Sequence, residues 1–155
     1  MRRTDGLKDS GIALLRVGIG GIFVAHGIQK LAVFGIGGLA GMLGPLGIPF
    51  PTLSAIAVTA AELLGGLALV AGFATRWAAL PIAFSMLVAG ITVHLQQGFF
   101  APNGVEYVLA LFLASVALSL TGSGALSVDR WIETRRQDRG IAEPERTLPQ
   151  AVEVR

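Results

Sequence analysis

Four apolar stretches dominate this 155-residue chain, and each is long enough to cross a lipid bilayer as a helix. Crossing the hydrocarbon core takes about 20 helical residues, and the predicted spans cover residues 12–32, 53–74, 77–95 and 105–120. Hydrophobic residues make up 53% of the chain and charged residues 14%, a balance outside the range of ordinary soluble domains. The sequence therefore predicts an all-α fold, a four-helix transmembrane bundle.

Small residues recur along the first two spans. The first carries five of them between Gly18 and Gly27, and the second places Ala57, Ala61 and Gly65 at intervals of four. Because lipid offers no hydrophobic drive for association, helices in a membrane approach each other most closely at such residues. We therefore expect a tight four-helix bundle.

The connection between the first two spans is unusual. Residues 34–51 include six glycines, three prolines and no charged residue. The segment is too short and too broken to span the membrane, and it has no charge to hold it in water. We expect an apolar Gly/Pro-rich loop folded over the outer end of the bundle.

The sequence changes character after the fourth span. Residues 127–140 predict a short cytoplasmic helix with Trp131 and Ile132 on one side and arginines elsewhere, and an anionic leaflet would attract it. From Ile141 onward, Glu, Pro, Arg and Gln predominate, which predicts disorder. We divide the chain into a membrane domain, residues 1–131, and a charged cytoplasmic tail, residues 132–155.

Lysine and arginine outside the spans predict the orientation, because positive residues near span ends favour the cytoplasmic side. They lie before the first span, between the second and third at Arg76, and after the fourth, while the other two connections have none. We expect a multi-pass protein of the cell inner membrane with both termini in the cytoplasm. Arg16 interrupts the first apolar run and no small-x-small cleavage site follows, so we expect a retained helix rather than a signal peptide.

Two ionisable residues fall deep within the predicted spans. At about 1.5 Å per helical residue, Arg16 lies roughly one turn inside the cytoplasmic boundary and Glu62 lies near the middle of its span. A carboxylate there must bind a proton or pair with a cation, and Arg16 is the only deep cation that the depth estimate offers. We predict a structural intramembrane pair of Arg16 and Glu62, with proton or substrate movement through Glu62 as the alternative.

A second group of ionisable residues lies toward the outer ends of the spans: His26, Lys30, His94 and Glu106. His26 and Lys30 are four residues apart and share one helix face. A carboxylate beside a lysine and two histidines can bind a carbonyl group and relay protons, as a quinone headgroup requires. We predict a quinone and proton site here, the alternative being that these groups only mark the water interface.

Other cofactors receive less support from the sequence. Two histidines at similar depth, His26 and His94, would allow bis-histidine haem ligation, but two histidines of unknown orientation support it only weakly. The chain has no cysteine, which excludes disulfides, iron–sulfur ligation and thiol redox chemistry by this chain alone. No metal site is predicted.

The order of residues resembles the DoxX family over about residues 11–131. The first span reads LLRVGIGGIFVAHGIQKL, and the second reads AELLGGLALVAGFATRWAAL with a closing Gly-x-x-x-Arg pattern. The third matching segment begins at Gly98 and reads GFFAPNGVEYVLALFLASVALSLTGSGALSVD. The residues that carry the resemblance are Arg16, Gly18, Phe23, His26, Gly27, Lys30, Leu31, Glu62, Gly65, Gly66, Gly72, Arg76, Gly104, Glu106, Gly122, Gly124, Ser127 and Asp129.

This resemblance implies a small four-helix membrane protein associated with oxidoreductases. One branch of the family is related to the membrane subunit of a thiosulfate:quinone oxidoreductase, and another relative joins a membrane complex with superoxide dismutase and a sulfurtransferase. We therefore expect the membrane subunit of a quinone-linked oxidoreductase or of a redox-protection complex. Two alternatives stay open: a non-catalytic scaffold that recruits soluble redox enzymes, and a permease for small solutes or protons. The expected partners are the lipid bilayer and redox subunits, with self-association left open and no nucleic acid.

Overall fold

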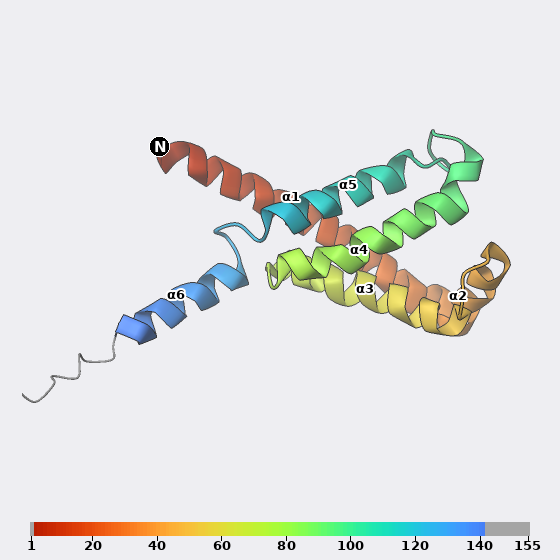
Figure 1. Ribbon diagram of the computed structural model, residues 1–155, viewed down its shortest axis with the longest axis horizontal. Helices are drawn as coiled ribbons and strands as arrows, with labels where there is room; N and C mark the ends of the chain where they lie inside the picture. The colour runs from red at the N-terminus through yellow and green to blue at the C-terminus, as the bar shows by residue number, and fades with distance from the viewer. Residues whose placement is uncertain (1, 142–155) are drawn as a thin grey trace, which may run out of the picture.

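Helices account for nearly all of the chain that the structure, a computed structural model, describes, namely residues 2–141 (Figure 1). The α-helices are α1 (Arg2–Gln29), α2 (Gly35–Leu43), α3 (Pro51–Ala71), α4 (Thr75–Ala89), α5 (Glu106–Thr121) and α6 (Val128–Ile141). Two π-helical segments continue α1 and α4, at Lys30–Phe34 and Gly90–His94, and short 3-10 turns follow at Gly44–Leu46 and Leu95–Gln97. The described residues include no strand, so the all-α prediction is confirmed.

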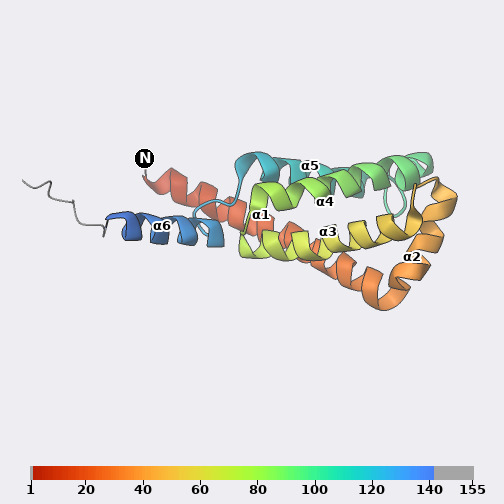
Figure 2. The same cartoon turned by 60° about the horizontal axis from the view of Figure 1, so that its bottom comes forward.

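The long helices form two layers. Helix α1 packs along α3 in one layer, and α4 packs along α5 in the other (Figures 1 and 2). The layers meet where α3 turns into α4, and they separate toward the opposite end, where α2 lies (Figures 1 and 2). The start of α1 and all of α6 lie at the first of these ends, called here the α6 end, and the other is called the α2 end.

The four predicted spans agree with the helices to within a few residues, except that α1 begins well before residue 12. Three stretches are long and apolar enough to cross a membrane: Gly6–Leu46, Pro51–Ala71 and Thr75–Gln97. The fourth, Glu106–Thr121, is apolar but has only 16 residues. The structure is therefore that of a helical membrane bundle with one short member.

One connection differs from the prediction. The segment expected as a loop, residues 34–51, contains helix α2 and a 3-10 turn, because its first proline comes only at Pro45 and α2 can pack against α3. Helix α6 was predicted at residues 127–140 and is confirmed, so the boundary drawn after Trp131 falls inside a helix. The rest of the predicted tail, residues 142–155, lies outside the described residues.

Glycines bring α1 and α3 into direct backbone contact. A Cβ at Gly20 would lie 2.7 Å from the Gly66 carbonyl oxygen, and a Cβ at Gly66 would lie 2.8 Å from the Gly20 carbonyl oxygen. Further along α1, a Cβ at Gly27 would lie 2.8 Å from the Leu63 amide nitrogen. These contacts hold the two helices antiparallel in one register, whereas Gly65 of the predicted small-residue stripe faces α4.

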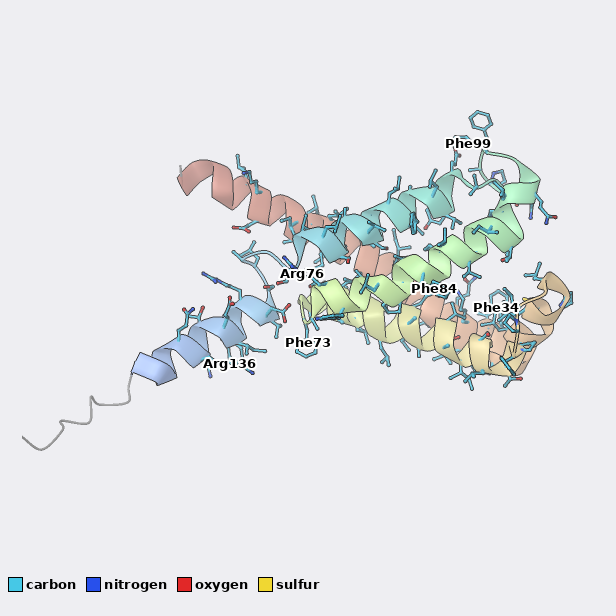
Figure 3. The ribbon with its side chains drawn as sticks, viewed as in Figure 1. Phe34, Phe73, Arg76, Phe84, Phe99 and Arg136 are labelled. Atoms are coloured by element: carbon cyan, nitrogen blue, oxygen red, sulfur yellow. The ribbon has the colours of Figure 1, made fainter. Side chains whose placement is uncertain are left out.

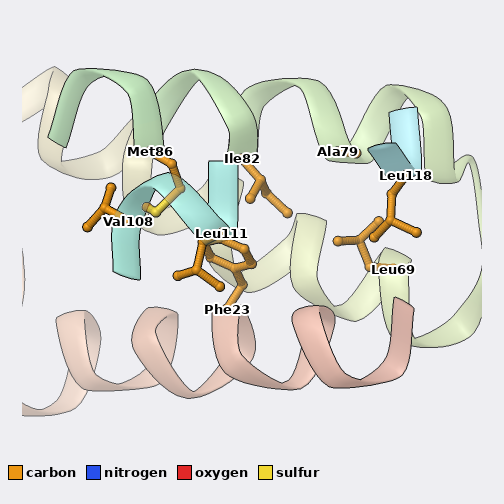
Figure 4. Packing of buried hydrophobic residues seen from close by; sticks show 8 residues of the cluster. All are labelled: Phe23, Leu69, Ala79, Ile82, Met86, Val108, Leu111 and Leu118. Atoms are coloured by element: carbon orange, nitrogen blue, oxygen red, sulfur yellow. The ribbon is translucent and has the colours of Figure 1, made fainter. Parts of the chain in front are cut away.

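The hydrophobic core lies where the two layers meet. Its members come from α1, α3, α4 and α5 (Figure 4) and are Phe23, Leu69, Ala79, Ile82, Met86, Val108, Leu111 and Leu118. Phe23 projects from α1 toward Leu111 of α5, so this cluster closes the bundle at mid-height. Beyond it, toward the α2 end, the layers have no comparable core.

Candidate functional site

A cavity of about 680 Å³ occupies the space between the layers at the α2 end. Helices α1, α3, α4 and α5 all contribute to its wall. Helix α2 and the turn after it, residues 35–50, are called here the α2 segment, and they cover the cavity with Leu39, Leu43, Ile48 and Pro49. Most of the wall is apolar, and its few ionisable side chains are His26, Lys30, Glu62, His94 and Tyr107. The predicted cover over this end of the bundle is therefore present, as a helix instead of a loop.

An ion pair is built into the cavity wall. Lys30 Nζ lies 2.5 Å from Glu62 Oε2, and the Glu62 side chain is 2% exposed while that of Lys30 is 18% exposed. Lys30 begins the π-helical extension of α1, and Glu62 lies on the face of α3 that meets α1. The pair joins the two helices at the α2 end of their contact.

The predicted pairing of Glu62 with Arg16 is wrong. Gly27 of α1 packs on Leu63 of α3, so the antiparallel register brings Lys30 beside Glu62. The same register brings Arg16 beside Gly72. At 1.5 Å per residue, Arg16 and Lys30 are roughly 20 Å apart along α1, which no arginine side chain can bridge.

Three of the four residues of the predicted quinone and proton site line the cavity, and the fourth does not. His26, Lys30 and His94 all line the cavity, although they come from opposite layers. Glu106 lies outside the lining, and its Oε1 accepts a hydrogen bond of 2.7 Å from the Ala101 amide. Since that bond holds the turn before α5, Glu106 stabilises the connection instead of joining the site.

His94 is held by the same connection. Its Nδ1 lies 2.8 Å from the Asn103 carbonyl oxygen. A carbonyl oxygen only accepts, so Nδ1 carries the hydrogen of this bond and Nε2 is the nitrogen left for a ligand or a proton.

Both π-helical segments border the cavity. One begins with Lys30 and the other ends with His94. Such turns are rare and occur often at functional sites, because the wider turn displaces side chains from their α-helical positions. Their presence on both layers at the same end supports a binding site there.

Two residues of the cavity lining, Tyr107 and Glu62, were not among the predicted quinone and proton site residues. Tyr107 is the only tyrosine of the chain and lies one turn before the buried Leu111 on α5, a spacing that could have placed it on the inner face. Glu62 was predicted as a structural partner of Arg16, with proton or substrate movement as the alternative, and it lines the cavity beside Lys30. The hydroxyl groups of Ser54, Ser85 and Thr92 also reach the wall, each already donating to a backbone carbonyl.

Arg16 serves the opposite end of the bundle. Its guanidinium donates to the carbonyl oxygens of Ser123, at 2.8 Å, and Leu126, at 2.6 Å, and the residue is 3% exposed. Gly72 makes room for it, with φ of 71° and no Cβ, since a Cβ would overlap the guanidinium. Arg16 thereby attaches α1 to the connection between α5 and α6.

Asp129 completes this attachment from α6. Its Oδ1 accepts a 2.9 Å hydrogen bond from the Ala74 amide, and its own amide donates to the Gly72 carbonyl at 3.1 Å. Arg76, labelled in Figure 3, packs its side chain against Gly122 at the end of α5. These contacts, called here the α5–α6 junction, link the turn between α3 and α4 to the start of α6.

Replacing Arg16 by alanine is expected to loosen the α5–α6 junction. Hydrogen bonds from a charged group contribute about 1.5–3 kcal/mol each, and two carbonyl groups would lose their donor. Thermal unfolding in detergent should shift to lower temperature, and trypsin should cleave after Arg130 earlier. Arg16→Lys should recover little, because an ammonium lacks the forked geometry. The exposed Lys8→Ala on the same helix is the control, and equal behaviour of the two alanine variants would contradict the assignment.

Comparisons with known proteins find a matching family model and several relatives. Residues 11–95 match the protein-family model described as DoxX. A Bacillus subtilis (strain 168) protein named "Putative oxidoreductase CatD" is 36% identical over 79% of this chain and 87% of its own length.

Two further relatives come from other bacteria. The Escherichia coli (strain K12) protein named "Inner membrane protein YphA" is 28% identical over 77% of this chain and 88% of its own length. An uncharacterized Haemophilus influenzae protein is 29% identical over 83% of this chain and 96% of its own length. No solved structure matches the chain.

Proposed function

The chain belongs to the DoxX family of membrane proteins, and from this premise we propose that it is the membrane subunit of an oxidoreductase and binds a quinone in its cavity. The observation that carries the proposal is the buried Lys30–Glu62 pair in the wall of an apolar cavity within the apolar helices. Ionisable groups at such depth are costly and mark functional sites by default. The name of the Bacillus subtilis relative points to the same class of reaction.

The cavity fits a quinone in size and in chemistry. Its volume of about 680 Å³ lies within the range of about 300–1,000 Å³ that small-molecule sites occupy. Apolar walls suit a ring and its hydrocarbon tail, and a few converging polar groups suit the ring oxygens. Quinone reduction takes two electrons and two protons to give the quinol, and a separate redox subunit would supply the electrons.

The polar residues have distinct parts in this proposal. The Lys30 ammonium has three donors, so it can keep its bond to Glu62 and donate to a ring oxygen as well. His94 presents Nε2 and His26 its imidazole from the facing layer, and an imidazole can accept or donate a hydrogen bond to a ring oxygen. Glu62 keeps the ammonium in position and is the acceptor nearest to it.

The orientation forms part of the same proposal. The start of α1 and α6 lie at one end (Figure 1), and the basic residues in the first turns of α1 and within α6 favour the cytoplasm for that end. The cavity would then lie toward the outer leaflet of the membrane.

The test is direct binding of a tritiated long-tailed quinone to the purified chain in lipid nanodiscs. Wild type should bind it saturably, and His26→Phe should weaken binding about three- to tenfold, the value of one hydrogen bond. Gln29→Leu, a neighbouring exposed residue outside the lining, should bind like wild type. Absence of saturable binding to wild type would rule the proposal out. If soluble redox enzymes then copurified with the chain in a manner that depends on α6, a scaffold would be favoured instead.

A further inference from the structure

Between α3 and α4, part of the cavity wall is exposed on the outside of the bundle, and this part is called here the side opening. Three residues of α3 line it in one helical stripe, Ala57, Val58 and Ala61, and a facing stripe on α4 consists of Pro81, Phe84, Ser85 and Val88. Ala57, Pro81 and Phe84 are also exposed on the outside of the molecule. Phe84, labelled in Figure 3, is 67% exposed, so the same side chains bound the cavity and face the surroundings of the bundle.

This opening lies at the depth of the lipid hydrocarbon. Both stripes belong to stretches long and apolar enough to cross a membrane, Pro51–Ala71 and Thr75–Gln97. Helices α3 and α4 meet at their shared turn and diverge from it toward the α2 end (Figures 1 and 2). The distance between the two helix backbones therefore grows toward the α2 end, where the cavity lies.

Other routes into the cavity are more obstructed. The α2 segment covers the end of the bundle with Leu39, Leu43, Ile48 and Pro49. Between α1 and α5, Phe23 and Leu111 are buried and pack within one core cluster (Figure 4). Tyr107 is the single exposed residue of the lining on that side.

We infer that the ligand enters the cavity sideways from the bilayer, between α3 and α4, and that it is a long-tailed quinone whose tail stays in this gap. The inference rests on the proposed function. With the ring near Lys30 and Glu62 and the tail between Ala57 and Phe84, the ligand never has to leave the apolar phase. The small Ala57 and Ala61 leave room for a chain there, and Phe84 flanks it.

Ala57→Trp tests the opening, because a large ring there would fill the gap between the helices. The rate at which a tritiated long-tailed quinone binds in nanodiscs should fall on the order of tenfold, within the range over which association rates vary among variants of one site. A tail-less quinone should be slowed less, because only its ring has to pass the gap. The matched control is Ile56→Trp on the next residue of α3, which is 49% exposed and outside the lining; it should bind both ligands like wild type.

A second variant distinguishes a blocked opening from a cavity that Ala57→Trp has destroyed. Phe84→Ala should speed entry of the long-tailed quinone, with Leu87→Ala as its exposed control outside the lining. If wild type binds both quinones and neither Ala57→Trp nor Phe84→Ala changes the long-tailed rate, the side opening is refuted and the proposed function stands. If Ala57→Trp slows both quinones equally while Phe84→Ala has no effect, the opening is refuted as well. If wild type binds neither quinone, the proposed function itself has failed.

Discussion

Lys30→Met is expected to destabilise the folded bundle by about 3–5 kcal/mol, the usual cost of leaving one member of a buried ion pair alone. Glu62 is 2% exposed, so its carboxylate would keep neither water nor its cation. Glu62→Leu should cost less, because Lys30 is 18% exposed and can extend its ammonium toward the end of the bundle. The double variant Lys30→Met/Glu62→Leu should recover much of the loss, since apolar replacement of both partners is often neutral.

The free energy of unfolding measured in mixed micelles distinguishes these outcomes. The expected order of destabilisation is Lys30→Met, then Glu62→Leu, then the double variant. Equal losses for all three would mean that the pair contributes packing but no charge compensation. Glu62→Gln adds a functional readout: if Glu62 carries protons or solutes through the membrane, this variant should stay folded and abolish flux.

Gly20→Val is expected to force α1 away from α3. The free energy of unfolding should fall by about 3 kcal/mol or more, at the upper end of overpacking effects. A Cβ at Gly20 would lie 2.7 Å from the Gly66 carbonyl oxygen and 3.0 Å from Leu69 Cβ, and backbone cannot give way there without separating the helices. The loss should appear as a lower unfolding temperature and less monodisperse protein on size-exclusion chromatography.

The adjacent Gly21 offers a matched control. A Cβ at Gly21 meets nothing within 4 Å, and the residue is exposed. Gly21→Val therefore adds the same side chain to the same turn of α1 without touching α3. If Gly21→Val proved as destabilising as Gly20→Val, the effect would lie in helix propensity and not in the contact between α1 and α3.

The membrane fold could be predicted because apolar length is a property of the sequence alone. Four runs of suitable length predicted helices within a few residues of those observed, except at the start of α1, and small residues indicated close helix packing. Helix α2 was not predicted because glycine and proline usually mark loops. Packing against α3 stabilises this glycine-rich helix, and the sequence pattern does not reveal that contact.

The partner of Glu62 could not be predicted, because depth along a span does not reveal the register between two helices. Arg16 was the nearest cation by depth, but the Gly27–Leu63 contact selects Lys30. Glu106 shared its depth with His94, yet its carboxylate bonds to the local backbone at Ala101. In the first case a contact between two helices decided the outcome, and in the second a hydrogen bond to backbone five residues away did so.

The separation of the two layers has a consequence for how the protein is kept intact. At the α6 end, side chains and backbone supply the contacts between layers, whereas at the α2 end a space of about 680 Å³ stands in their place. A molecule filling that space would act as part of the hydrophobic core and stabilise the folded state in proportion to its concentration and affinity. The thermal stability of the bundle would then follow the supply of lipid-soluble ligand in the surrounding membrane.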